Sequence, residues 1–218
     1  MLLPFDFQTD PYIILDFSAA NRDLAQLDLT NTATFTDYVF GKLRAAGAVV
    51  GVGGYNEHRV IYRRSGHFND ATSEPRNAGP REIHLGLDFW ADAGTPVFAP
   101  LDSVVHSFAD NARFGDYGPT IILEHNQNGT LLYSLYGHLS RESLRGLAVG
   151  QPVRAGEKLA EIGPYPENGD WPPHLHFQLM TDLLGMSGDF PGVCSLADRG
   201  RLLAICPDPN GLLGIAGL

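Results

Sequence analysis

The heptapeptide His174-Leu-His-Phe-Gln-Leu-Met180 alternates polar and apolar side chains from His174 to Leu179. Successive side chains of a β-strand point to opposite faces, so this pattern predicts a strand with one polar and one apolar face. The polar face carries His174, His176 and Gln178, and the apolar face packs on a core. Two imidazoles side by side on a strand suit a metal ion, since imidazole binds zinc as a neutral donor. The alternative interpretation is two surface histidines on an edge strand.

Strand-like segments continue outward from this heptapeptide. Between Arg81 and Met180, short segments with strand character are separated by Gly, Pro, Asp and Asn residues. Such spacing predicts a mainly β fold, an antiparallel β-sheet sandwich or barrel. Besides the heptapeptide, the predicted strands are Leu87–Trp90, Pro96–Ala99, Ser103–Ala109, Thr120–His125, Leu131–Gly137 and Lys158–Ile162.

The residues before this region predict a helical N-terminal extension. Apolar residues recur at three- and four-residue steps from Thr34 to Gly47, as on one face of a helix, and Gly47 suits its C-cap. Ala48–Gly54 and Val60–Tyr62 are predicted as two short strands around a glycine turn. The run Gly51-Val-Gly53-Gly54 follows a helix and leads into a strand, the reverse of the order in a dinucleotide-binding fingerprint, so we interpret it as the turn.

These patterns divide the chain into three predicted parts. Residues 1–80 form the extension with one helix and a short hairpin, packed on the core. Residues 81–180 form the β domain, and residues 181–218, rich in Gly, Pro, Asp and Leu, form a wrapping tail. The oligomeric state cannot be derived from these patterns.

The net charge of the chain limits the classes of partner that it can bind. Among 218 residues, 15 Lys and Arg face 25 Asp and Glu, a formal net charge of −10, and no stretch collects the basic residues into a stripe. Nucleic-acid binding depends on neutralising phosphates and is therefore disfavoured.

Pro4 and Asp6 interrupt the apolar run that a signal peptide needs, and no apolar run approaches the ~20 residues that span a bilayer. The sequence thus predicts a cytoplasmic protein without a nucleic-acid or membrane partner.

A second cluster of polar residues is His84-Leu-Gly-Leu-Asp88. In an extended segment the even spacing puts His84 and Asp88 on one face. A carboxylate beside an imidazole suits a borderline cation such as Zn²⁺, and one of the paired histidines would make a set of three ligands. Three protein ligands leave the fourth position to water, as in catalytic zinc sites.

The third cluster is Tyr136-Gly-His138, at the end of an apolar segment. A histidine in this position is often only a surface residue. The remaining histidines lie in no comparable cluster and are predicted to be structural or solvated: His58, His67, His106 and His125.

In their joint order, the three clusters resemble the lysostaphin-type zinc endopeptidases, whose pattern is HxxxD, then YxH, then HxH. The similarity covers residues 81–180 and includes framing segments such as Gly94–Pro100 and Pro173–Phe177. It implies an antiparallel β peptidase domain with one zinc ion per chain, held by His84, Asp88 and His176. It also implies His138 and His174 as catalytic histidines, and a peptide or peptidoglycan fragment as substrate.

Two features depart from that family. Gly169–Pro173 replaces the usual Ser-Thr-Gly-Pro before the HxH strand, and Gln178 replaces the usual Glu after it, which alters the rim of the expected groove. In addition, Asp116–His125 and Gly188–Val193 resemble the peptidase-like segment of large bacterial fusion proteins that contain an aminotransferase. This second resemblance hints at an intracellular role away from the cell wall.

Two further hypotheses stay open at the level of sequence. Val153–Ile162 is similar to the second half of biotinyl, lipoyl and sugar-phosphotransferase carrier domains. Lys158 lies where a strand begins rather than at a hairpin tip, so we expect no lipoyl or biotinyl group on it. A phosphohistidine carrier or binding module could use two facing histidines, but it would not need Asp88. The other hypothesis is a degenerate peptidase fold that serves as a scaffold.

Overall fold

The computed structural model describes residues 1–69, 79–127 and 129–218. The strands are β1 (Tyr12–Leu15), β2 (Val50–Gly53), β3 (Arg81–His84), β4 (Leu87–Trp90), β5 (Pro96–Phe98), β6 (Ser103–Asn111), β7 (Gly118–Gln127), β8 (Thr130–Gly137), β9 (Pro152–Val153), β10 (Lys158–Glu161), β11 (His174–Met180) and β12 (Val193–Ser195). The α-helices are α1 (Thr32–Ala46), α2 (Arg199–Leu203) and α3 (Asn210–Leu213). Short 3₁₀ turns cover Arg22–Gln26, Ile61–Arg64, Gly66–Asn69 and Arg141–Leu144.

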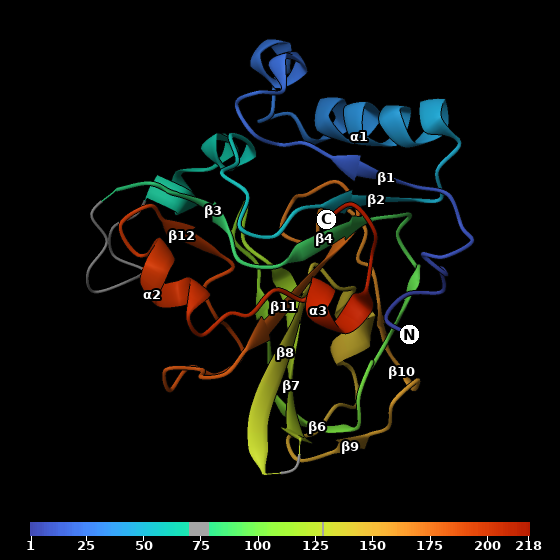
Figure 1. Cartoon of the computed structure of the whole chain (residues 1–218), viewed down its shortest axis with the longest axis vertical. Helices are drawn as coiled ribbons and strands as arrows, with labels where there is room; N and C mark the ends of the chain where they lie inside the picture. Colours follow the sequence, from blue (N-terminus) through green and yellow to red (C-terminus); the bar gives the residue numbers. More distant parts are fainter. Residues whose placement is uncertain (70–78, 128) are drawn as a thin grey trace.

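One large sheet organises the molecule (Figure 1). Its eight strands follow the order β1-β2-β4-β11-β8-β7-β6-β9, and two small sheets pair β10 with β5 and β12 with β3. The prediction of a mainly β fold is confirmed. The large sheet is open at β1 and β9, so the described strands close no barrel. It is also mixed, because β1 and β2 run parallel and α1 supplies the crossover that parallel neighbours need.

Most predicted elements are present. The bounds of β4 and β11 agree with the prediction, and the predicted helix begins two residues earlier, with the Asn31 side chain accepting a bond from Thr34 N. Gly47 ends this helix in the left-handed conformation, at a φ of 64°. The strands β1, β3, β9 and β12, of two to four residues each, were not predicted.

The predicted strand at Ala48–Gly54 is present as β2, but the second strand at Val60–Tyr62 and the glycine turn between them are wrong. Residues 61–64 form a 3₁₀ turn, and Gly51 and Gly53 lie inside β2, between β1 and β4. A Cβ on Gly51 would come within 2.6 Å of the Leu15 side chain, and one on Gly53 within 2.6 Å of the Arg59 guanidinium. These glycines therefore serve close packing rather than chain reversal.

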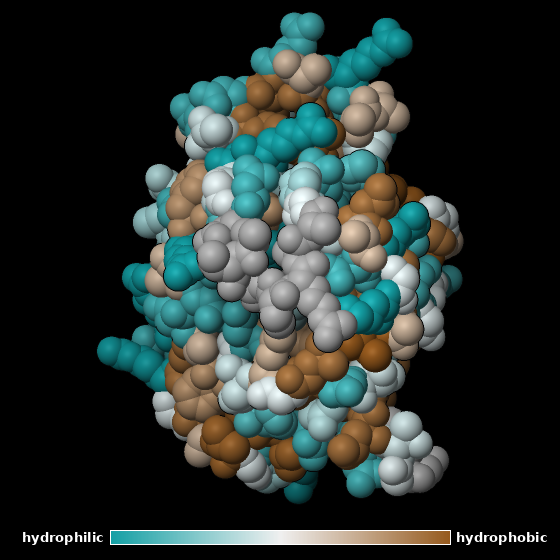
Figure 2. Space-filling view, turned by 90° about the vertical axis from the view of Figure 1, so that its left-hand side faces the viewer, coloured by the Kyte–Doolittle hydropathy of each residue, from teal (hydrophilic) through white to brown (hydrophobic). Residues whose placement is uncertain are grey.

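The expected boundaries at residues 80 and 180 stay a prediction, although strands from all three parts pair with one another. From the first part, β1 and β2 join the sheet that contains β4 and β11. From the last part, β12 pairs with β3. The side of the molecule that carries β3, β12 and α2 mixes hydrophilic and hydrophobic residues (Figure 2). None of the helices in the described ranges combines the length and hydropathy needed to traverse a bilayer.

Helix α1 is joined to the centre of the sheet by an aromatic cluster. Phe35 is fully buried and its ring lies 6.0 Å from that of Phe17, 5.8 Å from Trp90 and 6.4 Å from Trp171. Trp90 in turn stacks on the imidazole of His174, with centroids 4.0 Å apart and planes 13° from parallel. The packing of α1 thus reaches the polar face of β11.

We expect Phe35→Ala to lower the free energy of unfolding by about 3–5 kcal/mol, because it leaves a cavity among these rings. Chemical denaturation followed by tryptophan fluorescence measures the change. Lys42→Ala on the same helix removes an exposed ion pair with Asp23 and a cation–π contact with Tyr38, and should change stability by no more than about 1 kcal/mol. Equal losses in the two variants would contradict the proposed anchoring role of Phe35.

Candidate active site

Three neighbouring strands bring His84, Asp88 and His176 together. His84 ends β3, Asp88 lies in β4, and His176 of β11 is paired in register with Asp88. Between the first two residues, Gly86 allows β11 to come close, since a Cβ there would lie 2.6 Å from the Phe177 carbonyl oxygen. All three polar side chains are buried. We refer to them as the donor cluster.

The donor atoms of this cluster form a compact triangle. His84 Nε2 lies 3.0 Å from His176 Nδ1, and Asp88 Oδ1 lies 3.2 Å from the first nitrogen and 3.0 Å from the second. Zinc ligands about 2.0–2.1 Å from the metal at tetrahedral angles lie roughly 3.3–3.4 Å apart. The spacing of the three atoms therefore fits one face of a tetrahedral zinc site.

In each histidine of the donor cluster, the ring nitrogen that points away from the other donors makes a hydrogen bond, and this bond determines which ring nitrogen carries the proton. His84 Nδ1 lies 2.8 Å from the Gly54 carbonyl oxygen, which can only accept, so this nitrogen carries the proton and Nε2 offers a lone pair. Burial and the nearby Arg59 charge lower the pKa of His84 to about 4, so the ring is neutral at pH 7.

His176 is oriented by Gln178, the residue that replaces the glutamate of the family pattern. His176 Nε2 lies 3.0 Å from Gln178 Oε1, while Gln178 Nε2 donates to the Pro191 carbonyl. In the neutral form of His176 the proton sits on Nε2 and the lone pair of Nδ1 faces Asp88. Two nitrogen lone pairs and a carboxylate oxygen then converge with no proton between them, an arrangement that a bound cation stabilises.

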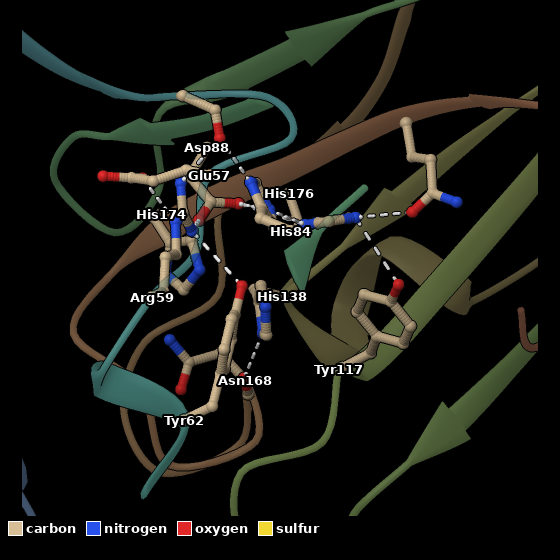
Figure 3. Close-up of polar contacts among 12 residues, drawn as sticks. Glu57, Arg59, Tyr62, His84, Asp88, Tyr117, His138, Asn168, His174 and His176 are labelled. Atoms are coloured by element: carbon tan, nitrogen blue, oxygen red, sulfur yellow. Dashed lines mark hydrogen bonds and ion pairs between the residues drawn. The ribbon is translucent and has the colours of Figure 1, made fainter. Parts of the chain in front are cut away.

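The second oxygen of Asp88 faces the other way (Figure 3). Oδ2 accepts a hydrogen bond of 2.5 Å from Nη1 of Arg59, and Nε of that arginine donates to Glu57. Arg59 is fully buried. Although burial acts to raise it, the neighbouring His84 and Arg59 hold the pKa of Asp88 well below its usual range. The two oxygens of the carboxylate therefore have different partners: Oδ1 faces the histidines and Oδ2 contacts the guanidinium.

His138 and His174 lie next to each other beside the donor cluster. Their ring centroids are 4.1 Å apart, and both residues are buried. His138 follows β8 with a φ of 61°, a left-handed conformation that a residue other than glycine seldom adopts. Gly137 before it packs so closely on Tyr117 that a Cβ would overlap the Tyr117 ring. Local backbone packing therefore determines where this histidine lies.

The same two histidines each donate to a backbone carbonyl. His138 Nδ1 lies 2.8 Å from the Asn168 oxygen, and His174 Nδ1 lies 2.8 Å from the Pro172 oxygen, so Nε2 is the unprotonated nitrogen in both neutral rings. Burial lowers the pKa of His174 to about 4 and, together with His174, lowers that of His138 well below its usual value. Both rings are therefore neutral bases at pH 7.

A cavity adjoins these side chains and is lined by Asp88, His138, His174 and His176. Further lining residues come from the 3₁₀ turns before β3, namely Ile61, Tyr62, His67 and Phe68, and from residues 186 and 189–193. Trp171, within the altered segment before β11, also lines the cavity. The site is therefore enclosed by segments on both sides of the β domain.

The structure brings all five predicted site residues together, while their individual roles stay a prediction. Of the other histidines, His58 is exposed beside Glu82, His106 bonds Ser107, and His125 is buried against Ser134. His67 lines the cavity, which the sequence did not indicate. Sequence analysis also missed Arg59 and Tyr117, whose hydroxyl lies 3.4 Å from His176 Nε2. The alternation of β11 predicted the correct face for the Gln178 side chain, but it did not predict that this side chain contacts His176.

Comparison with known proteins matches residues 82–186 to the model of Peptidase family M23. Over 116 residues the chain is 34% identical to an uncharacterized metalloprotease of Haemophilus influenzae, covering 53% of this chain and 22% of that protein. Over 120 residues it is 31% identical to the L-Ala--D-Glu endopeptidase of Bacillus subtilis, covering 53% and 35%. The catalytic domain of lysostaphin from Staphylococcus simulans aligns at 27% identity with a TM-score of 0.42, covering 61% and 80%. The chain thus spans about a quarter to a third of these two curated relatives.

The hydrogen bonds of the histidines predict their tautomers in the metal-free protein. At pH 7 we expect His84, His138 and His174 to be neutral with the proton on Nδ1. Long-range ¹H–¹⁵N correlation spectra of the imidazoles distinguish this tautomer, and His106→Ala serves to test the assignment procedure. A proton on Nε2 of His138 or His174 would show that this nitrogen cannot accept a proton from a substrate or water.

Proposed function

Residues 82–186 form a peptidase family M23 domain, and on this premise we propose that the chain is a zinc-dependent endopeptidase that hydrolyses a peptide bond. The observation that carries the proposal is the buried triangle of His84 Nε2, Asp88 Oδ1 and His176 Nδ1, beside two neutral histidines. The two nitrogens and one carboxylate oxygen are the donor types that zinc takes in catalytic sites, with the fourth position open to water or substrate.

In the proposed site, His84, Asp88 and His176 hold one Zn²⁺. The bound ion would supply Lewis-acid activation of a water molecule and of the scissile carbonyl group. The Gly54 carbonyl and the Gln178 amide keep the two histidine rings turned toward the ion. The unprotonated Nε2 that neutral His84 presents requires no deprotonation when a metal binds.

His138 and His174 are the proposed proton carriers. Each has its Nδ1 proton committed to a carbonyl oxygen, so Nε2 can accept a proton from the attacking water. The same Nε2, once protonated, can donate to the leaving amine. A protonated ring also supplies positive charge next to the oxyanion that develops on the carbonyl oxygen. The two side chains line the cavity together, so either can serve as the base.

Peptidoglycan or a related peptide is the proposed substrate class. The proposal rests on similarity to proteins named L-Ala--D-Glu endopeptidase, DD-carboxypeptidase/endopeptidase and peptidoglycan DD-endopeptidase. The cavity walls formed by residues 61–68 and 189–193 lie outside the segment that matches the family model. The preferred peptide is therefore expected to depend on residues of this chain that the family does not specify.

A phosphohistidine carrier or binding module is not favoured. The match to a peptidase family supports the enzyme instead, and a carrier would have no need of the buried carboxylate in the donor cluster. Lys158 lies at the start of β10 and pairs with Glu161, as expected for an unmodified lysine.

We expect the purified chain to bind one Zn²⁺, and His84→Ala and Asp88→Asn to lose it, because each removes a ligand. Inductively coupled plasma mass spectrometry after gel filtration gives the metal content, and circular dichroism confirms that each variant is folded. His106→Ala is the matched histidine control and should keep one ion per chain. A parent protein without zinc after reconstitution, or folded variants with full zinc content, would refute the proposed zinc site.

We expect His138→Ala and His174→Ala to keep one zinc ion but to cut peptide bonds about 10²–10⁴-fold more slowly, because each removes a proton carrier. Release of new amino groups from purified peptidoglycan and from a peptide library measures the rate. Undiminished hydrolysis by both variants would refute their proposed roles. If the zinc-loaded parent cleaves nothing in either assay, the protein is better described as a peptidase-like scaffold.

A further inference from the structure

We infer that Arg59 is a positioning residue for the donor cluster: it occupies Oδ2 of Asp88 so that this carboxylate binds the metal through Oδ1 alone. The inference rests on the proposed function, since it assumes a metal ion at the cluster. It extends the site to a segment outside residues 82–186, which we call the outer segment and define as residues 53–62.

Arg59 is held rigidly, because every nitrogen of its guanidinium has a partner. Nε lies 2.7 Å from Glu57 Oε2, Nη2 lies 3.1 Å from the Gly54 carbonyl oxygen, and Nη1 contacts both Asp88 Oδ2 and the Tyr62 hydroxyl. The side chain has no exposed surface. A planar guanidinium bonded on all sides fixes both the position and the rotation of the carboxylate it contacts.

The backbone around Arg59 is shaped to admit it. A Cβ on Gly53 would lie 2.6 Å from Nη2 and 3.4 Å from the Asp88 side chain, so β2 leaves this space for the guanidinium. Glu57, which bonds Nε, is itself fixed through its other oxygen by the backbone N–H of Phe17 at 2.8 Å. The guanidinium is thereby tied to the chain that follows β1.

A single carbonyl group links this arginine to the first histidine. The Gly54 oxygen accepts from Arg59 Nη2 and also from His84 Nδ1. The outer segment therefore orients two of the three donors, His84 through Gly54 and Asp88 through Arg59. Removing a group that hydrogen-bonds to a metal ligand typically lowers metal affinity or activity 10–100-fold.

The contact has a specific consequence for coordination. A carboxylate can bind a metal through one oxygen or through both, but Oδ2 is already engaged by a cation that points away from the histidine nitrogens. Binding through Oδ1 alone keeps the protein ligand count at three and leaves the fourth position open. Without Arg59, Oδ2 becomes available to the metal, and the coordination number rises.

Cobalt(II) provides a spectroscopic probe of this coordination in the full chain. Four-coordinate Co²⁺ absorbs visible light much more strongly than five- or six-coordinate Co²⁺. We expect the parent protein to give the strong four-coordinate spectrum. Arg59→Gln should weaken the visible bands and lower the affinity for Co²⁺ and Zn²⁺ by about 10–100-fold, measured by competition with a chelator. An unchanged spectrum with unchanged affinity would overturn the inference.

Arg59→Lys tests the geometry separately from the charge, and it protects the experiment if Arg59→Gln fails to fold. Lysine keeps the positive charge beside Asp88 but cannot reproduce the guanidinium contacts to Glu57, Gly54 and Asp88 at once. We expect weaker visible bands than in the parent. A parent-like spectrum in Arg59→Lys would show that charge alone suffices and would contradict positioning by the guanidinium.

Arg64→Gln is the matched control. This arginine lies in the 3₁₀ turn next to Arg59, is 4% exposed, and bonds Thr32 and the Asp170 carbonyl rather than the donor cluster. It should lose stability while keeping the cobalt spectrum and metal affinity. Equal spectral changes in the Arg59 and Arg64 variants would show that the effect comes from a general loss of stability, and would overturn the inference. A parent that binds no Co²⁺ or Zn²⁺ instead refutes the proposed metal site itself.

Discussion

Two opposite charges, the Asp88 carboxylate and the Arg59 guanidinium, lie in contact, and both side chains are almost entirely buried. Removing such ions from water costs several kcal/mol each, and their attraction offsets this only where the remaining hydrogen-bonding positions are filled. Here Glu57, Gly54 and Tyr62 fill those of the guanidinium, and the histidines face the free oxygen of the carboxylate. Loss of one partner typically costs 3–5 kcal/mol in other proteins. The same pair therefore holds the residues around Arg59 against β4 and organises the donor cluster.

Local sequence patterns were sufficient for the central strands. In β11, alternation from His174 to Leu179 gave the face of His174, His176 and Gln178, because a slip by one residue would exchange the polar and apolar faces of the strand. The shared face of His84 and Asp88 was also predicted from spacing. The resemblance to a family then joined segments that lie 92 residues apart, which no local pattern can do.

Arg59 and the glycines of β2 show where such patterns fail. Arg59 lies 29 residues from Asp88, just before the predicted strand Val60–Tyr62, and its importance arises from the burial of its charge and its contact with Asp88. The glycines of β2 resemble a turn because glycine permits unusual backbone angles. Their actual cause is the space required by Leu15 and Arg59, which comes from other parts of the chain. His138 and His125 both lie at or near strand ends, yet only tertiary packing separates a cavity residue from a core residue.

Part of the cavity lining lies outside the segment that contains the donors, and this bears on the substrate of the proposed peptidase. The groups proposed to bind the metal and to transfer protons come from β3, β4, β11 and the residue after β8, all but the start of β3 within the segment that matches the family. The cavity walls at residues 61–68 and 189–193 fall outside it. Specificity follows from contacts that differ between competing substrates, and those contacts are made by walls rather than by the reacting centre. Similarity to the relatives therefore does not transfer their substrates to this chain. The lining residues Ile61 and Tyr62, which are proposed to contact the peptide, belong to the same outer segment as Arg59.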